Sequence, residues 1–66
     1  MGENMTVKEL LFHAGGSIRY RIEDYDTMKV IDEGTVDDYI VDLDNKINYE
    51  VEAIDVDNDN TLVVIV

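Results

Sequence analysis

A helical start occurs twice in this chain, first as Thr6-Val7-Lys8-Glu9-Leu10-Leu11 and again as Thr35-Val36-Asp37-Asp38-Tyr39-Ile40. The two stretches lie 29 positions apart, and the same shift places the alternating segment 18–23 on the segment 47–52. Self-similarity at a fixed period is the signature of a repeated supersecondary unit. The chain therefore predicts an internal repeat, 6–33 and 35–66, in which each copy is one helix followed by two strands.

Each copy begins with a helix-capping signal. The Thr6 hydroxyl can accept a hydrogen bond from the Glu9 amide while the Glu9 carboxylate reaches back to Thr6, and Thr35 with Asp38 repeats the pair. The apolar stripes that follow at helical spacing are Val7, Leu10, Leu11 and Ala14, and then Val36, Tyr39, Ile40 and Leu43. We expect the glycines 15–16 to stop the first helix after Ala14.

Alternating apolar and polar residues predict the strands. We expect strands over 18–23, 28–32, 47–56 and 61–66, with turns at 24–27 and 57–60. Gly34 is expected to break the second strand. The apolar parity reverses near Ala53, which predicts a β-bulge or a strong twist there.

These elements predict a small α+β fold, in which a four-stranded antiparallel sheet carries both helices on one face. Pairing of the first and third strands at the centre would place Arg21 opposite Glu50 and Arg19 opposite Glu52. The alternative is that the last strand, apolar on both parities, lies inside the sheet. The expected core consists of Val7, Leu10, Leu11, Tyr20, Ile22, Val36, Tyr39, Ile40, Leu43, Tyr49 and Val51.

The charge balance narrows the function classes. Sixteen acidic residues oppose five basic ones in 66 residues, which gives a formal net charge of −11. Five basic residues are too few to contact the phosphates along a nucleic-acid backbone, and we therefore expect no direct binding of nucleic acid. With no cysteine and no long apolar run, the sequence predicts neither a disulfide scaffold nor a membrane span. We expect a cytoplasmic protein with a flexible leader, residues 1–5, and a single domain, residues 6–66.

Catalytic and metal-binding patterns are not recognisable in the sequence. The segment 55–59 matches the opening of a calcium-binding EF-hand loop, but that loop needs glycine at its sixth position and glutamate at its twelfth. Asn60 and Val66 stand there, so a polar hairpin turn is the favoured interpretation. The only histidine, His13, lies near Ser17 without a nucleophile motif. We therefore predict no catalytic residue, no metal site, no cofactor and no enzymatic activity.

Acidic residues gather in the middle of the chain, with Lys29 as the only base among them. The eight candidate partner-binding residues are Asp24, Asp26, Asp32, Glu33, Asp37, Asp38, Asp42 and Asp44. A solvated face is one explanation, but the net charge exceeds the magnitude of about 2 to 8 that serves solubility in a small domain. Closely spaced carboxylates can also occupy a basic channel in place of a nucleic acid.

In size, charge and lack of cysteine the chain resembles the small acidic proteins of phages and mobile elements, among them DNA mimics and anti-CRISPR inhibitors. The resemblance implies an inhibitor that docks on a basic nucleic-acid-binding protein and blocks it. The alternative is a small self-associating structural or accessory protein. In that case the strand from Thr61 to Val66 forms a homodimer, because its outward apolar residues would otherwise be exposed.

Overall fold

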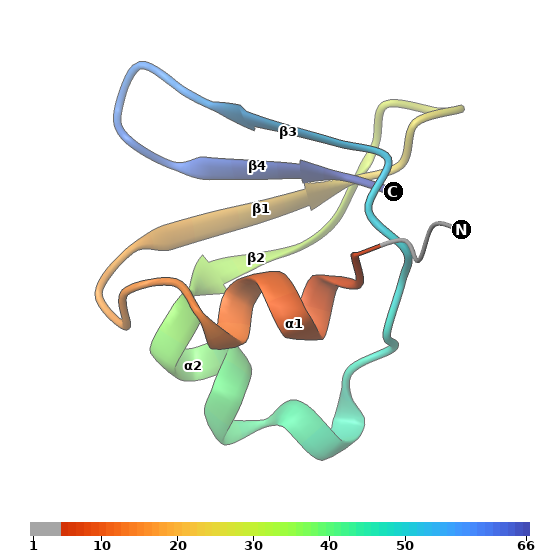
Figure 1. Cartoon of the computed structure of the whole chain (residues 1–66). Helices are drawn as coiled ribbons and strands as arrows, with labels where there is room; N and C mark the ends of the chain where they lie inside the picture. The colour runs from red at the N-terminus through yellow and green to blue at the C-terminus, as the bar shows by residue number, and fades with distance from the viewer. Residues whose placement is uncertain (1–4) are drawn as a thin grey trace.

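The structure, a computed structural model, describes residues 5–66 as two short helices and a four-stranded mixed sheet (Figure 1). The helices are α1 (Val7–Phe12) and α2 (Val36–Val41), and a 3-10 turn, η1 (Leu43–Asn45), follows α2. The strands are β1 (Arg19–Glu23), β2 (Val30–Thr35), β3 (Ala53–Val56) and β4 (Leu62–Ile65), in the spatial order β2-β1-β4-β3. The expected α+β class is confirmed.

Both helices begin at the expected capping residues. Thr6 Oγ1 accepts a hydrogen bond from the Glu9 backbone N–H (3.3 Å), and Glu9 Oε1 accepts one from the Thr6 N–H (3.0 Å). Thr35 Oγ1 accepts a hydrogen bond from the Asp38 N–H (3.3 Å). These local bonds satisfy amide groups that the first turn of a helix leaves unpaired, which is why the sequence locates the helix starts well.

The glycines after α1 have a different role from the expected one. α1 already ends at Phe12, before these glycines. Among the glycines that the structure describes, the one with a positive φ is Gly34. A Cβ atom on Gly16 would lie 2.4 Å from Asp37 Oδ1, and the Asp37 N–H donates to the Gly16 carbonyl oxygen (3.0 Å). Gly16 therefore lets the start of α2 approach closely. Gly34 does not break β2 but lies within it, opposite Tyr20.

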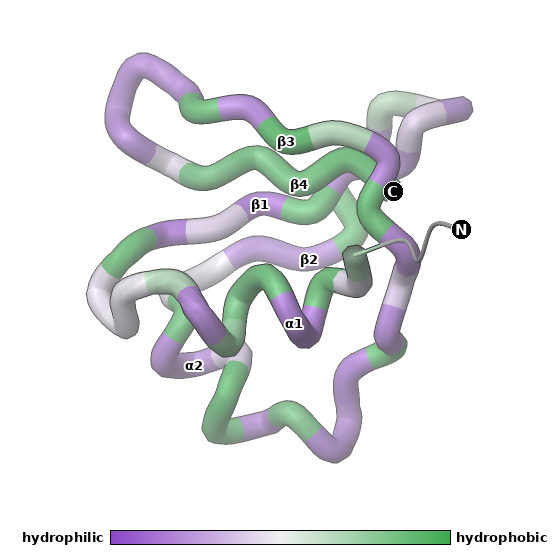
Figure 2. Tube along the Cα trace, viewed as in Figure 1, coloured by the Kyte–Doolittle hydropathy of each residue, from purple (hydrophilic) through white to green (hydrophobic). Residues whose placement is uncertain are grey.

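The sheet is not the antiparallel one that the sequence predicted. β1 pairs with β2 antiparallel and with β4 parallel, while β3 pairs with β4 antiparallel. The order with the third strand beside the first is therefore wrong, and the alternative with the last strand inside the sheet is correct. Figure 2 shows the physical reason, because β4 is apolar along its whole length. Such a strand is stable between two neighbours, where both of its faces and both of its edges are covered.

The segment 47–51, expected as part of a strand, lies outside the sheet. The Val7 N–H donates to the Tyr49 carbonyl oxygen (2.9 Å), and the Val51 N–H donates to that of Met5 (2.8 Å). The segment thus runs antiparallel beside the start of α1, and the two sequence copies fold differently. Met5 is held by this contact, and the rest of the expected leader lies outside the described residues.

The chain enters β3 through an irregular step. Ala53 is the register partner of Ile65, but the N–H of the preceding Glu52 donates to the Ile65 carbonyl oxygen (2.6 Å). Two consecutive residues thus face one residue of the neighbouring strand, as in a β-bulge. This step accounts for the reversal of apolar parity near Ala53.

Arg21 lies on the outer face of the sheet, beside Val63. Because β1 and β3 are not neighbours, Arg19 and Arg21 do not face residues 52 and 50, as the sequence had suggested. The Arg21 guanidinium instead pairs with Glu23 (2.6 Å) and Asp57 (3.2 Å). Val63 is only 7% exposed although both helices lie on the other face. β4 lies between β1 and β3 and so has no free edge, and Val63 on its outer face is covered within the chain. The homodimer through the strand 61–66 stays a prediction.

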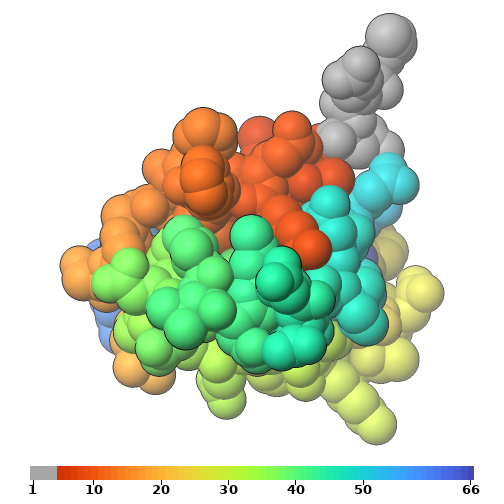
Figure 3. All heavy atoms as spheres, turned by 90° about the horizontal axis from the view of Figure 1, so that it is seen from below, coloured from red at the N-terminus to blue at the C-terminus, as the bar shows by residue number. Residues whose placement is uncertain are grey.

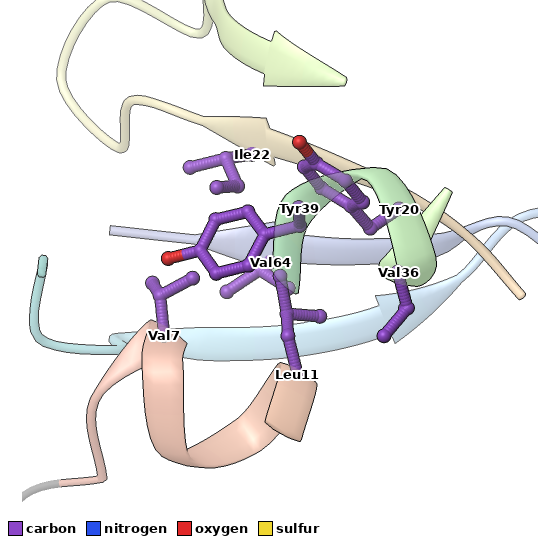
Figure 4. Close-up of a cluster of buried hydrophobic side chains, with 7 residues drawn as sticks. All are labelled: Val7, Leu11, Tyr20, Ile22, Val36, Tyr39 and Val64. Atoms are coloured by element: carbon purple, nitrogen blue, oxygen red, sulfur yellow. The ribbon is translucent and has the colours of Figure 1, made fainter. Parts of the chain in front are cut away.

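One hydrophobic cluster joins both helices to one face of the sheet (Figure 4). Its buried members are Val7, Leu11, Tyr20, Ile22, Val36, Tyr39 and Val64. The rest of the expected core, Leu10, Ile40, Leu43, Tyr49 and Val51, packs against this cluster partly buried. The placement of both helices on one face is thus confirmed. Val64 was missed because the central position of β4 was not the favoured prediction.

Candidate functional site

α2 and the turn after it carry four of the eight candidate acids. Asp37 and Asp38 lie in the first turn of α2, Asp42 is its C-cap residue and Asp44 lies in η1. All four are exposed. The positive end of the helix dipole favours the first two carboxylates, whereas the negative end disfavours the other two. Asp42 is, however, also the N-cap residue of η1, and Asp44 lies in the first turn of η1, where acidic residues are favoured.

Val41 lies among these acids and is 87% exposed, more than any other large hydrophobic residue that the structure describes. It follows Asp38 by three positions and Asp37 by four, so the three side chains are neighbours on the helix surface. We name Asp37, Asp38, Val41, Asp42 and Asp44 the acidic face. In Figure 3, α2 and η1, in green to turquoise, lie at the front of the molecule with no other element over them.

Within residues 5–66, the ion pairs leave the acidic face without a cation. They use Arg21 and Lys46, and they end on carboxylates outside the face. Asp42 Oδ1 accepts a hydrogen bond from the neutral amide of Asn45, through Nδ2 (2.6 Å). The face therefore presents its negative charge to the solvent.

Three of the other candidate acids lie away from the acidic face. Asp24 and Asp26 belong to the loop between β1 and β2, whereas α2 begins at the opposite end of that hairpin (Figure 1). β1 has 5 residues, so the two ends are about 16 Å apart. Asp24 Oδ1 accepts from the Asp26 N–H (2.8 Å), a turn-forming contact. Glu33 lies opposite Arg21 on the outer face of the sheet. The eight acids do not form one surface.

Asp32, the remaining candidate, points toward the helices. Its Oδ2 accepts hydrogen bonds from the Tyr20 hydroxyl (2.9 Å) and the Lys46 ammonium group (2.8 Å). Burial acts to raise the pKa of Asp32, but the hydrogen bonds from Lys46 and Tyr20 outweigh it and hold that pKa below its ordinary value. Burial, followed by the bond to Asp32, raises the pKa of Tyr20. Asp32 thus links β1, β2 and the segment after η1, and its charge is satisfied inside the molecule.

A pocket of about 200 Å³ opens beside Asp32. Its apolar walls are Ile22, Ile31, Ile47 and Tyr49. Its polar lining comes from Asp32, Tyr39, Asn45 and Lys46. Pockets for drug-sized ligands usually measure about 300 to 1,000 Å³, so this pocket matches a smaller group.

Tyr39 contributes a buried hydroxyl group without a hydrogen-bond partner. The residue is 1% exposed. Among the residues that the structure describes, its hydroxyl oxygen is the one buried side-chain polar atom that lacks a hydrogen-bond partner. The ring meets the Tyr20 ring edge-on, with centroids 5.3 Å apart, and Lys46 Nζ lies 5.4 Å from its centroid. Figure 4 shows the hydroxyl at the end of the ring away from Tyr20, on the side of Val7. Burial, followed by the charge of Asp32, raises the pKa of Tyr39, which keeps the hydroxyl protonated at neutral pH.

The acidic segment 55–59 serves a hairpin turn. Asp57 pairs with Arg21 (3.2 Å), and Asp59 Oδ1 accepts from the Thr61 N–H (3.3 Å). Asn60 adopts a left-handed conformation, with φ of 66°. In residues 5–66 no group of three or more histidine, cysteine, aspartate or glutamate side chains is placed to hold a metal ion.

Sequence reasoning found the acids of α2 and η1 but missed Val41, Tyr39 and Lys46. Val41 had a signal, because it lies outside the apolar stripe of its helix. Neither the unpaired Tyr39 hydroxyl nor the contact of Lys46 with Asp32 has a sequence signal, because both depend on how distant segments pack.

Comparison of the chain with protein-family models, with curated proteins and with solved structures found no match. Neither helix in the described part of the chain is long and apolar enough to cross a membrane. The acidic face and the pocket are therefore the candidate functional features of the described residues.

Proposed function

We propose that this protein is a non-enzymatic acidic binding protein that docks on a basic nucleic-acid-binding protein and blocks it. The acidic face is the docking surface. The observation that supports this most directly is that Val41 is 87% exposed between acids on both sides of it in α2 and η1.

An apolar side chain within a charged rim is typical of protein interfaces. Residues near the centre of an interface lose their water and supply most of the binding energy, while the polar rim stays partly solvated. A surface that served solubility alone would gain nothing from an exposed valine. Asp42 and Asp44 extend the charged rim around Val41 beyond the end of α2.

The proposed partner follows from charge. The chain carries a net charge of −11, and duplex DNA presents about one negative charge per 1.7 Å of its axis. A rigid helix surface with clustered carboxylates can therefore compete for a basic groove that binds nucleic acid. Attraction over long distances would speed the association and make it sensitive to salt. Such a role agrees with the resemblance to small acidic phage inhibitors and places the protein in the cytoplasm.

The test is a double charge reversal, Asp37→Lys with Asp38→Lys. The immobilised parent and variant would be exposed to a cell lysate treated with nuclease, and the retained proteins identified by mass spectrometry. We expect the parent to retain nucleic-acid-binding proteins that both added salt and added duplex DNA release. For a purified partner, the reversal should lower the association rate constant about tenfold or more at low salt, as surface-plasmon resonance would show.

The matched control changes the net charge equally at a distance from the acidic face. Asp26→Lys with Glu52→Lys reverses two exposed acids outside α2 and η1. If this control weakened binding as much as the Asp37 and Asp38 reversal, overall charge and not the acidic face would be responsible. Binding that resisted both salt and DNA would exclude the nucleic-acid mimic.

A further inference from the structure

We propose that the free edge of β3 is a docking site for an extended, basic segment of another protein, which adds a fifth strand to the sheet. The strand order β2-β1-β4-β3 leaves β2 and β3 as the two edge strands. Figure 1 shows β3 at the upper rim of the sheet, where no described helix or strand lies against its outer edge. This site lies outside the acidic face, and neither proposal needs the other.

The backbone of β3 has hydrogen-bonding groups that face away from β4. The Asp57 N–H donates to the Thr61 carbonyl oxygen on the β4 side (2.9 Å), and in an antiparallel ladder every second residue of a strand faces its neighbour in this way. Asp55 therefore also faces β4, whereas the N–H and C=O groups of Ile54 and Val56 point to the free edge. An added strand would form its main-chain hydrogen bonds with these two residues.

The surface of β3 on the helix side is apolar and only partly covered. Ile54 and Val56 are the register partners of Val64 and Leu62, which belong to the core or pack against it, so all four side chains lie on one face of the sheet. Ile54 is nevertheless 46% exposed and Val56 61% exposed. Apolar side chains of an added strand would lie beside these two residues and remove their surface from water.

Asp55 makes this edge selective for a basic segment. Its Oδ1 accepts a hydrogen bond from the Val56 N–H (2.8 Å), so in the free chain the carboxylate occupies an outward-facing donor. A neutral strand would displace the carboxylate without offering it a new partner. A lysine or arginine opposite Asp55 would bind the carboxylate and release the Val56 N–H for main-chain pairing.

The other edge of the sheet is closed more firmly. On β2, Asp32 Oδ1 accepts from the Glu33 N–H (2.9 Å) in the same way. Asp32 Oδ2, however, is held by the Tyr20 hydroxyl (2.9 Å) and the Lys46 ammonium group (2.8 Å). A ligand cannot draw this carboxylate away without breaking both contacts. Asp55 is exposed and has no such second contact within residues 5–66, so β3 is the edge that can accept a strand.

The charge around β3 sets the sign of the partner. Residues 47–66 contain five acidic residues and neither lysine nor arginine. Arg21, on the same outer face, is already paired with Glu23 and Asp57. A second copy of β3 would bring further carboxylates to this edge, and like charges on paired strands are destabilising. The occupant is therefore a segment of a different protein, in which lysine or arginine alternates with apolar residues.

The test is a titration of the peptide acetyl-Lys-Val-Lys-Val-Lys-Val-amide into the ¹⁵N-labelled full chain, followed by amide chemical shifts. We expect saturable shifts in residues 53–56. One control peptide carries N-methylvaline at each valine, which keeps the charge but removes the N–H groups that would pair with Ile54 and Val56. The other has serine in place of lysine, which keeps the main chain but removes the charge. Each control should bind about tenfold or more weakly. Equal affinities of the three peptides, or shifts absent from residues 53–56, would overturn the proposal.

A pair of variants at one position tests the main-chain pairing. Ile54→Pro removes an outward N–H and no bond to β4, a replacement that edge strands tolerate, whereas Ile54→Ala keeps the N–H. Both lose the apolar contact of the isoleucine, so Ile54→Pro should bind the lysine peptide about tenfold more weakly than Ile54→Ala does. Equal binding by the two variants would exclude strand addition at this edge. Neither variant changes the acidic face, so docking through that face should persist in both.

A second pair of variants tests the role of Asp55. Asp55→Asn keeps an oxygen that can accept from the Val56 N–H but removes the charge, so it should abolish most of the preference for the lysine peptide over the serine peptide. Asp37→Asn removes the same charge from the acidic face and should leave that preference unchanged. If both variants reduced the preference equally, overall charge would be responsible and the location at β3 would be refuted.

Discussion

Replacement of Gly16 by alanine tests the close contact between the loop after α1 and the start of α2. The new Cβ atom would lie 2.4 Å from Asp37 Oδ1 and 2.8 Å from its Cγ, whereas ordinary contacts are 3.4–4 Å. The atoms must therefore separate by about 1 Å. The Asp37 backbone stays in place, because its N–H donates to the Gly16 carbonyl oxygen (3.0 Å), so the exposed carboxylate must turn about its side-chain bonds to make room. Rotation of a side chain away from its preferred geometry costs about 0.5 to 1.5 kcal/mol.

Gly15→Ala is the matched control, because its Cβ atom would meet only the flexible side chain of Ile18, at 3.3 Å from Cδ1 and 3.6 Å from Cγ1. Both substitutions reduce the conformational freedom of the unfolded chain equally, so the difference between them isolates the contact with Asp37. We expect the free energy of unfolding of Gly16→Ala to be about 0.5 to 1.5 kcal/mol below that of Gly15→Ala. In a domain of this size each kcal/mol lowers Tm by about 4 to 8 °C.

Urea unfolding followed by circular dichroism would measure both variants and a double-mutant cycle with Asp37→Ala. Removal of the carboxylate should recover most of the loss caused by Gly16→Ala, because the clashing atoms are gone. Equal stability of Gly15→Ala and Gly16→Ala, or a loss unchanged in the Asp37→Ala background, would refute the packing of α2 against this loop.

Three further predictions concern the core and the buried polar groups. Leu11→Ala, at a residue that is 0% exposed, should lower the free energy of unfolding by about 2 to 5 kcal/mol, and Leu10→Ala, at a half-buried position, should cost less in the same urea titration. Tyr39→Phe removes an unpaired hydroxyl and should leave Tm unchanged or raised. Tyr20→Phe removes the hydrogen-bond donor to Asp32 and should lower the free energy of unfolding by about 1 to 2 kcal/mol. The reverse ranking of the two variants in calorimetry would contradict these hydrogen-bond assignments. The pKa of Asp32 is lower in the folded than in the unfolded chain, so the ionised carboxylate stabilises the fold above about pH 4, and this stabilisation is lost as the pH falls through the folded pKa. The difference in free energy of unfolding between the parent and Asp32→Asn should therefore shrink from about pH 6 to about pH 3.

The sequence predicted the local features of the fold well. Thr6 and Thr35 were found as helix caps because a cap needs only residues a few positions apart. The apolar parity of Tyr20 and Ile22 likewise located a half-buried strand.

The arrangement of the strands could not be predicted in the same way. Cross-strand charge pairing favoured Arg21 beside the third strand, but a surface ion pair contributes about 0 to 1 kcal/mol, and burial of β4 on both faces contributes more. The segment 47–51 alternates like a strand because one side of it packs against the core, although its partner is the start of α1 and not the sheet. Apolar parity reports which side is buried and not which neighbour covers it.

The parallel pairing of β1 with β4 sets the order of events during synthesis. Tyr20 and Ile22 of β1 emerge early from the ribosome, but their neighbours Leu62 and Val64 emerge more than 40 residues later. The helices and the β1–β2 hairpin must therefore wait with one side of their core open until β4 arrives. Contacts between distant parts of a chain slow folding, and the uncovered surface is prone to aggregation in the meantime. The strong negative charge would keep nascent copies apart during that interval, so it would protect the chain from aggregation before the fold is complete.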